Sequence, residues 1–411
     1  MQDWKTIKLN ELITTITDYH ANGAYKKLKE NVTLLDNINF AAMIRSTNFE
    51  KNDFNDLKYI DEHAYEFLGK SKVFPGDVLM NKIANPGTVY YMPDLKLPVS
   101  LGMNLLLLRF NKETSPYFIY QYLKAKEQYV KSFTAGSVTK TITKQAVRNL
   151  DIILPPLPEQ CAIASILSAL DDKIELNLQM NKTLEEMAMA LYKHWFVDFG
   201  PFQNGKFVDS ELGMIPEGWE VKRLEEILKF KKGKKPKKVS PEYQEGFLPQ
   251  ILISSFDENL SGFAATQNMV ITNQLDILMV MDGSGSGRTE IGFAGIVGST
   301  ISRIDIKEQF EKLRFITYLL LRSNQQLIKE NTTGTSIPHT DKSFIFNFII
   351  PVPDKKVIDS FNLQAKKFIE LIKSNLNENR NLKKTRDTLL PKLISGEVRL
   401  KDVEKLVHES L

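Results

Sequence analysis

The chain has 411 residues, of which 42% are hydrophobic and 25% are charged, and its formal net charge is +4. This composition predicts a soluble globular protein of two or three domains, and the small net charge excludes a histone-like polycation. The single cysteine, Cys161, excludes an intramolecular disulfide and a cysteine-ligated structural zinc site. We therefore expect a cytoplasmic protein. Because the sequence has neither an apolar signal core nor a run of ~18 apolar residues, we expect no membrane span.

Residues 1–155 predict a first globular domain, which we call the first head. Short β-rich runs at 77–82, 88–92 and 104–110 alternate with turn signals. A helical stretch at 116–130 leads to a loop that begins at Gly136. An apolar, strand-like run and a proline stop at Pro155 follow this loop.

Residues 156–200 carry the pattern of a coiled-coil helix. One row of the predicted seam recurs every seven residues, at Ile163, Leu170, Asn177, Leu184 and Leu191. We predict that a second row contains Ile166, Met180 and Met187 and is interrupted by Lys173. An asparagine buried in such a seam commonly fixes the register of the helices at some cost in stability.

Residues 201–218, PFQNGKFVDSELGMIPEG, are rich in glycine and proline and predict a linker. Residues 219–353 then predict a second globular domain, the second head. It contains KFKKGKKPKK at 229–238, with seven lysines in ten residues, and the glycine-rich stretch ILMVMDGSGSGRT at 277–289.

Residues 354–396 predict a second coiled-coil helix, which ends near Gly396, where glycine suits a helix stop. Its first seam row is Phe361, Phe368, Asn375, Leu382 and Leu389. Its second row is less complete, because Val357 and Leu371 alternate with the polar residues Gln364 and Glu378. Residues 397–411 form a short C-terminal tail.

The sequence predicts that the two halves of the chain are copies of one unit. GSVTKTITKQAVRNLDIILPP begins at Gly136, and GTSIPHTDKSFIFNFIIPVPD begins 198 residues later at Gly334. The same offset relates Pro155 to Pro353 and Asn177 to Asn375. A constant offset through a loop, a strand, a proline stop and the heptads predicts a duplicated scaffold.

The fronts of the two heads match more weakly. WKTIKLNEL at Trp4 resembles WEVKRLEEI at Trp219, 44–47 resembles 252–255, and 73–80 resembles 271–278, with the second front 17 residues shorter. We therefore predict an α+β fold. Two globular mixed α/β heads are separated by two long helices, which form an antiparallel coiled coil with a pseudo-two-fold internal repeat.

Four motifs, taken in order, resemble the specificity (S) subunit of type I restriction–modification systems: LPPLPEQ at 154–160, WFVDFGPF at 195–202, IPEGW at 215–219 and LLPKLISGE at 389–397. The resemblance covers nearly the whole chain. It implies that the heads are target recognition domains, each reading one half of a split, asymmetric sequence in double-stranded DNA. It also implies that the helices dock two methyltransferase (modification) subunits, which restriction (motor-nuclease) subunits can join. S-adenosylmethionine would then bind the methyltransferase partner, and this chain would bind no cofactor.

The second helix opens with PVPDKK at 351–356 in place of PLPEQ, so its docking end can differ from that of the first.

Basic and hydroxyl residues around the two glycine loops and the lysine-rich segment are the candidate DNA contacts, since lysine suits phosphate and hydroxyls suit base edges. In the first head the candidates are Arg45, Lys82, Thr139, Lys140, Thr141 and Lys144. In the second head they are Lys231, Lys232, Lys234, Lys235, Ser284, Ser286, Arg288, Thr335, Ser336, His339 and Lys342. The alternative for these residues is a solvated surface group.

The sequence predicts neither a catalytic site nor a metal site in this chain. The loop at 282–289 lacks the lysine of a phosphate-binding loop, and a β-like stretch follows it where a dinucleotide-binding loop would begin a helix. The five histidines lack the spacing of metal ligands. The alternative function is a non-catalytic coiled-coil adaptor with two protein-binding heads, which would explain the repeat but not the lysine-rich segment.

Overall fold

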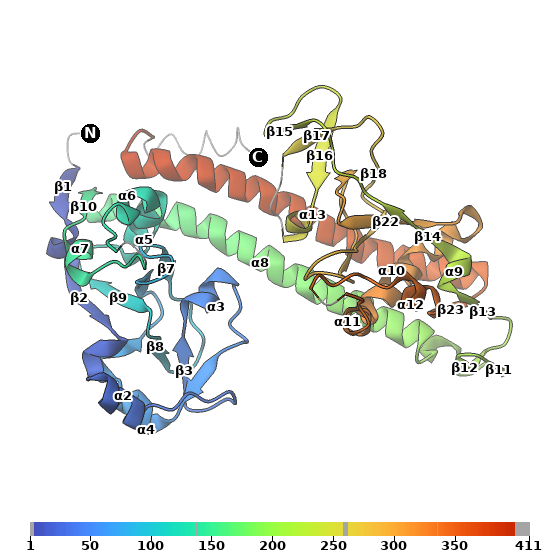
Figure 1. Cartoon of the computed structure of the whole chain (residues 1–411), viewed down its shortest axis with the longest axis horizontal. Coiled ribbons are helices and arrows are strands. Elements are labelled where there is room, and N and C mark those ends of the chain that lie inside the picture. The colour runs from blue at the N-terminus through green and yellow to red at the C-terminus, as the bar shows by residue number, and fades with distance from the viewer. Residues whose placement is uncertain (1–3, 137–138, 258–261, 335, 399–411) are drawn as a thin grey trace. The chain divides into compact units, whose positions relative to one another are not determined.

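A computed structural model describes residues 4–136, 139–257, 262–334 and 336–398 (Figure 1). The chain forms two compact units, one containing residues 1–173 and 381–411 and the other residues 174–380. Each unit contains one head and a segment of each long helix. Among the described residues, no helix is long and apolar enough to cross a membrane.

Within its described residues, the first head contains three sheets. A two-stranded ribbon pairs β1 (Lys5–Lys8) with β10 (Asp151–Leu154). An antiparallel sheet has the order β2 (Ile13–Asp18), β9 (Leu105–Phe110), β6 (Val78–Asn81) and β7 (Val89–Tyr91). A mixed sheet has the order β4 (Lys58–Ile60), β3 (Ala41–Ile44), β8 (Val99–Leu101) and β5 (Lys72–Val73), with β3 and β8 parallel. The helical elements are α1 (Leu9–Leu12), η1 (Tyr19–Asn22), α2 (Tyr25–Asn31), α3 (Ser46–Glu50), α4 (Glu62–Phe67), η2 (Gly69–Ser71), α5 (Pro116–Ala125), α6 (Glu127–Lys131) and α7 (Lys144–Arg148).

The described part of the second head has three corresponding sheets, with one more strand in the mixed sheet. Its ribbon pairs β13 (Glu220–Arg223) with β23 (Ile349–Val352). Its antiparallel sheet has the order β14 (Leu228–Lys232), β22 (Ile301–Ile306), β19 (Ile277–Val280) and β20 (Thr289–Glu290). Its mixed sheet is β15 (Val239–Ser240), β17 (Phe263–Ala265), β16 (Phe247–Ile251), β21 (Gly295–Val297) and β18 (Ile271–Thr272), with β16 and β21 parallel. The helical elements are α9 (Leu224–Ile227), η4 (Ile253–Asp257), η5 (Glu308–Leu313), α10 (Arg314–Ser323), α11 (Gln325–Glu330) and α12 (Lys342–Phe346).

Strand register confirms the duplication of the heads and corrects its alignment. Met80 lies opposite Leu106 in the first head, and Met279 lies opposite Ser302 in the second. Met279 is therefore the counterpart of Met80, one residue beyond the predicted Leu278. Gly102 donates to the carbonyl of Ile44, and Gly298 donates to that of Ile251, so the predicted match of 44–47 with 252–255 is also one residue off.

The inner strands of the central antiparallel sheet in each head are largely buried on both faces. In β9, Leu106 and Leu108 face one apolar cluster, whereas Leu105 and Leu107 face another. Strand β19 divides its side chains in the same way. Alternate residues of a strand point to opposite faces, so a continuous apolar run such as LLLL fits a strand covered on both sides.

The segment predicted as a linker, 201–218, has structure of its own. A short helical turn, η3 (Gly200–Phe202), precedes a hairpin of β11 (Phe207–Ser210) and β12 (Gly213–Pro216). Phe202 and Phe199 pack edge-on against Trp219, with ring centroids 4.9 and 5.6 Å away. The glycines and prolines that favour a linker therefore shape a hairpin next to an aromatic cluster.

Two long helices, α8 (Leu157–Phe196) and α13 (Lys355–Ser395), pair antiparallel within each unit. In the second unit Asn177 contacts Asn379, and Asn181 contacts Asn375, so partner numbers fall on one helix as they rise on the other. In the first unit Arg386 donates to Asp171 across the same seam at 2.7 Å. Helix α13 ends at Ser395, and Gly396 follows with a φ of 72°, as predicted.

The first predicted row of each seam is buried or half-buried, but the second row lies one residue away from its predicted position. Met180 and Met187 are 43% and 48% exposed, and Leu371 is 51% exposed. The residues that fill the second row instead are Leu167, Ile174, Asn181 and Ala188 on α8 and Ile358, Ala365 and Asn379 on α13. Two asparagines on each helix, not one, therefore lie in the seam.

The four seam asparagines form a polar layer with two-fold symmetric bonds. Asn177 Nδ2 donates to Asn379 Oδ1, and Asn375 Nδ2 donates to Asn181 Oδ1, both at 2.9 Å. All four side chains are buried, the most exposed being Asn375 at 9%. Because the repeat offset equates Asn177 with Asn375 and Asn181 with Asn379, each bond is the symmetry copy of the other.

Candidate nucleic-acid interface

Glycine is required at the start of both predicted loops. Gly136 and Gly334 have φ angles of 112° and 92°. A Cβ atom at either position would collide with a backbone carbonyl oxygen, that of Thr139 in the first head and that of Ile337 in the second. Positive φ and the absence of space both exclude other residues, so glycine has the same role at the start of both loops.

Each loop ends against the connection between the last two strands of the antiparallel sheet. Thr141 forms isolated bridges with Ala135 and Ile83, and His339 forms the equivalent bridges with Thr333 and Asp282. The loop and the strand connection therefore meet at one place in each head. We call this place the loop junction.

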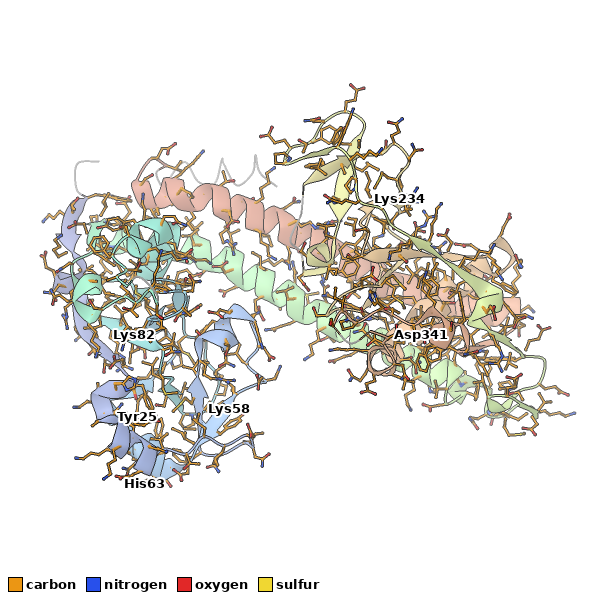
Figure 2. All side chains as sticks on the ribbon, in the orientation of Figure 1. Tyr25, Lys58, His63, Lys82, Lys234 and Asp341 are labelled. Carbon is orange, nitrogen blue, oxygen red and sulfur yellow. The ribbon has the colours of Figure 1, made fainter. Side chains whose placement is uncertain are left out.

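A carboxylate lies at the loop junction of the first head. Asp18, at the end of β2, is 5% exposed and accepts bonds from Lys82 Nζ at 2.9 Å and Lys144 Nζ at 3.0 Å. Burial alone would raise the pKa of Asp18, but the two lysine bonds hold this pKa below its usual value. Lys82 and Lys144, both predicted DNA contacts, are thus paired with an acid (Lys82 is labelled in Figure 2).

The loop junction of the second head holds the same kind of cluster with the charges exchanged. Asp282 Oδ2 accepts a bond from Lys232 Nζ at 3.0 Å, and Asp282 Oδ1 lies 2.7 Å from His339 Nδ1. Burial opposes ionisation, yet these two partners lower the pKa of Asp282. Lys232 lies opposite Ser302 in the register position that Asp18 occupies opposite Leu106. The first head therefore has its acid on β2 and a lysine after β6, whereas the second has a lysine on β14 and its acid after β19.

Two predicted contacts in the glycine-rich loop are internal to the second head. Ser286 is buried and donates to the carbonyls of Gly283 at 2.7 Å and Pro338 at 2.8 Å. Arg288 pairs with Asp257 at 2.7 Å and Glu290 at 2.9 Å. Both residues remain predicted DNA contacts, although their polar atoms bond within the head in this structure. Ser284 is exposed.

The lysine-rich segment begins as a strand. Lys231 and Lys232 belong to β14, and Lys234 and Lys235 follow it, all four exposed. Lys234, labelled in Figure 2, donates to the carbonyl of Asn268 at 3.3 Å. Because β14 pairs with β22 over its whole length, this part of the segment has a fixed backbone and is not a flexible loop.

The other candidates divide between exposed and engaged residues. Thr139, Lys140 and Ser336 are exposed and Thr141 is half-buried. Arg45 donates to the carbonyl of Asp56 at 2.8 Å, and Lys342 Nζ lies 5.6 Å from the centre of the Phe230 ring. Thr335 and most of the tail lie outside the described residues.

Comparison with known families identifies the protein family of this chain. Residues 1–186 and 216–383 each match the type I restriction modification DNA specificity domain. The two matches coincide with the two halves of the repeat and together cover most of the chain.

The chain belongs to this family.

Relatives support the assignment over the full length. The MjaIX specificity subunit of a type I restriction enzyme from Methanocaldococcus jannaschii is 28% identical over 350 residues, covering 81% of this chain and 80% of the relative. The HindI specificity subunit from Haemophilus influenzae is 23% identical, covering 97% of this chain and all of the relative. The crystal structure of a type I S subunit from M. genitalium has the same fold, with a TM-score of 0.59 at 17% identity over 95% of this chain and 96% of that one.

Membership in this family gives the chain a DNA-recognition role, as a specificity subunit that is not itself the catalyst. The sequence identifies all four basic residues bonded to the loop-junction acids but misses the acids themselves, Asp18 and Asp282. A signal is present for Asp282, which directly follows a fully apolar run. Among the described residues, no cluster of three histidine, cysteine or acidic side chains is arranged to hold a metal ion.

Proposed function

We propose that this specificity subunit reads a split, asymmetric DNA target, one half with each head, across a spacer that neither head reads. The observation that carries this proposal is the combination of similar sheet topology with different surface chemistry in the two heads. The loops GSVTKT and GTSIPH, the exchanged ion pairs and the single lysine-rich segment all differ between the heads. A duplicated scaffold with unlike reading surfaces suits an asymmetric target.

We also propose that the long helices dock two methyltransferase subunits, which bind S-adenosylmethionine, and that restriction subunits can join this assembly. Exposed apolar side chains on α8 support the docking role. Leu176, Met180 and Met187 are 43–50% exposed, and their spacing of four and seven residues places them on one helix face. Beyond Met187, Met189, Tyr192 and Val197 line a hollow of about 310 Å³. Exposed apolar surface of this kind commonly marks a protein-binding site.

Charge removal in the lysine-rich segment tests the DNA-binding role. In a chain carrying Lys231→Gln and Lys235→Gln, we expect lower affinity for target and non-target DNA alike, because phosphate contacts carry no sequence information. The slope of log affinity against log salt should become shallower by about 1 for each lysine–phosphate pair that the substitutions remove. Fluorescence anisotropy with labelled duplexes, measured from low to physiological salt concentration, gives both quantities.

Lys355→Gln with Lys356→Gln is the matched control, since it removes the same charge from exposed positions at the start of α13. An unchanged salt slope in the segment variant, or an equal change in the control, would remove this segment from the interface. If the wild-type chain with its methyltransferase bound no DNA at any salt concentration, the coiled-coil adaptor would replace DNA reading as the function.

Placing acids on the exposed face of α8 tests docking. Met180→Glu with Met187→Glu should weaken binding of the methyltransferase subunit by at least about tenfold, equivalent to 1.4 kcal/mol, because docking would bury two charges without partners. The folded chain should keep its stability, as both side chains are about half exposed. Co-purification and isothermal titration calorimetry measure the binding.

The control for this experiment is Gln179→Glu, which adds one charge at an exposed position of the same helix. Unaltered methyltransferase binding by the Met180 and Met187 variant would show that the partner docks elsewhere. A large decrease in binding by the control would indicate long-range repulsion instead of a local clash.

A further inference from the structure

Both loop junctions are built around one carboxylate that accepts bonds from two nitrogen groups. Asp18 accepts bonds from Lys82 and Lys144, which lie 64 and 126 residues further along the chain. Asp282 is bonded to Lys232 and His339. The acid lies on β2 in the first head and after β19 in the second. In both heads three chain segments are held together at the base of the glycine loop.

Backbone bonds show how closely this arrangement has been kept. Ile142 donates to the carbonyl of Lys82 at 3.1 Å, and Thr340 donates to that of Met281 at 2.8 Å. The backbone amides of Lys82 and Met281 in turn donate to the carbonyls of Asn104 and Thr300, both at 2.8 Å. The second head therefore has a methionine at the position of Lys82 and obtains its cation from Lys232 instead. The two heads thus form a carboxylate–cation contact, here called the tie, at the same backbone site with different side chains. This indicates that the contact itself is required.

Exposed polar residues lie next to both ties. Thr139 and Lys140 precede Thr141 in the first head, and Ser336 precedes His339 in the second. A side chain that reads a base edge must be held in place, because ordering a mobile loop on binding costs affinity. Each tie fixes the end of the loop on which these residues lie.

We propose that Asp18 and Asp282 are positioning residues for DNA recognition, each of which holds the glycine loop of its own head in its reading geometry and keeps its basic partners from acting as free phosphate contacts. This inference rests on the proposed reading of one half-site by each head. Loss of either carboxylate lowers sequence discrimination in one half of the target and leaves the other half unaffected. The freed Lys82 and Lys144, or Lys232, then add affinity for DNA of any sequence.

The test uses the full chain with its methyltransferase subunits and Asp18→Asn or Asp282→Asn. The probes are three duplexes: one with the intact motif, taken from the modified-base pattern of the host genome, and two with one half of that motif scrambled. Discrimination is the ratio of affinities for the intact and scrambled duplexes. We expect Asp18→Asn to reduce discrimination at one half by about tenfold or more and Asp282→Asn to reduce it at the opposite half.

Three further variants separate positioning from other roles. Asp151→Asn and Asp359→Asn remove an acid paired with Lys8 at 2.8 Å and with Lys312 at 2.6 Å, away from the loop junctions, and should leave both ratios unchanged. Lys82→Met, which installs the residue found in the second head, should reproduce the half-site effect of Asp18→Asn. If Lys82 contacted phosphate instead, this variant would weaken all three duplexes equally and flatten the salt slope.

Urea unfolding of each variant separates a local effect from loss of folding. Equal loss of discrimination at both halves, or no loss at either half in variants that remain folded, would overturn the positioning role. If the wild-type complex failed to prefer the intact duplex, the proposed function itself would fail, which is a distinct outcome.

Discussion

Replacing Asn177 and Asn375 together with leucine is expected to destabilise the helix pair. The sequence alone favours the opposite result, because an apolar residue in a coiled-coil seam usually adds stability while loosening the register. The structure reverses the expected change in stability, because each of these asparagines bonds to a second buried asparagine, Asn379 or Asn181, at 2.9 Å. The double substitution would leave both partners buried without these bonds, at about 1–3 kcal/mol for each. Urea or thermal unfolding of the full chain measures the effect.

Replacing all four asparagines with leucine provides the comparison. With no buried asparagine left without its partner, we expect this variant to recover the stability of the wild type or to exceed it. It should also lack the bonds that select one register, so crosslinks between cysteines introduced across the seam should report more than one alignment. A double variant more stable than the wild type would show that Asn181 and Asn379 are not the partners of Asn177 and Asn375.

The position of the seam can be predicted from the sequence only in part. The row from Ile163 to Leu191 is identifiable because its seven-residue repeat has no competitor. The other row is ambiguous, because apolar residues occur both three and four positions after residues of the first row, as with Ile166 and Leu167. An antiparallel partner decides between them, and heptad spacing in one helix carries no information about that partner. The exposure of Met180 and Met187, which heptad spacing places in the seam, suits a docking surface instead.

The loop junctions show a different limit. Glycines at equivalent loop positions can be found because positive φ leaves a mark on local sequence. The ion pairs cannot, since Asp18 and Lys144 are separated by 126 residues and only the sheet brings them together. Their exchange between the heads also removes any trace from an alignment of the two halves, as Lys232 replaces Asp18 and Met281 replaces Lys82. The two copies of a repeat can therefore keep the same ion-paired contact although different side chains form it.

Exchange of one head is expected to change one half of the DNA target. Residues 219–353 are suited to this exchange, because β13 and β23 pair along Glu220–Arg223 and Ile349–Val352 and so join the two ends of the segment. The donor should be a family member of known target that retains the apolar contacts to α8 and α13, where Ala188, Phe196 and Phe361 form part of the core of the second unit. The helices and the first head remain those of this chain.

The modified-base pattern of a genome expressing this hybrid with the methyltransferase tests most directly whether each head reads one half-site. We predict a hybrid motif, with one half from the donor and the other half unchanged. A motif that kept both original halves, or that became wholly that of the donor, would contradict the account.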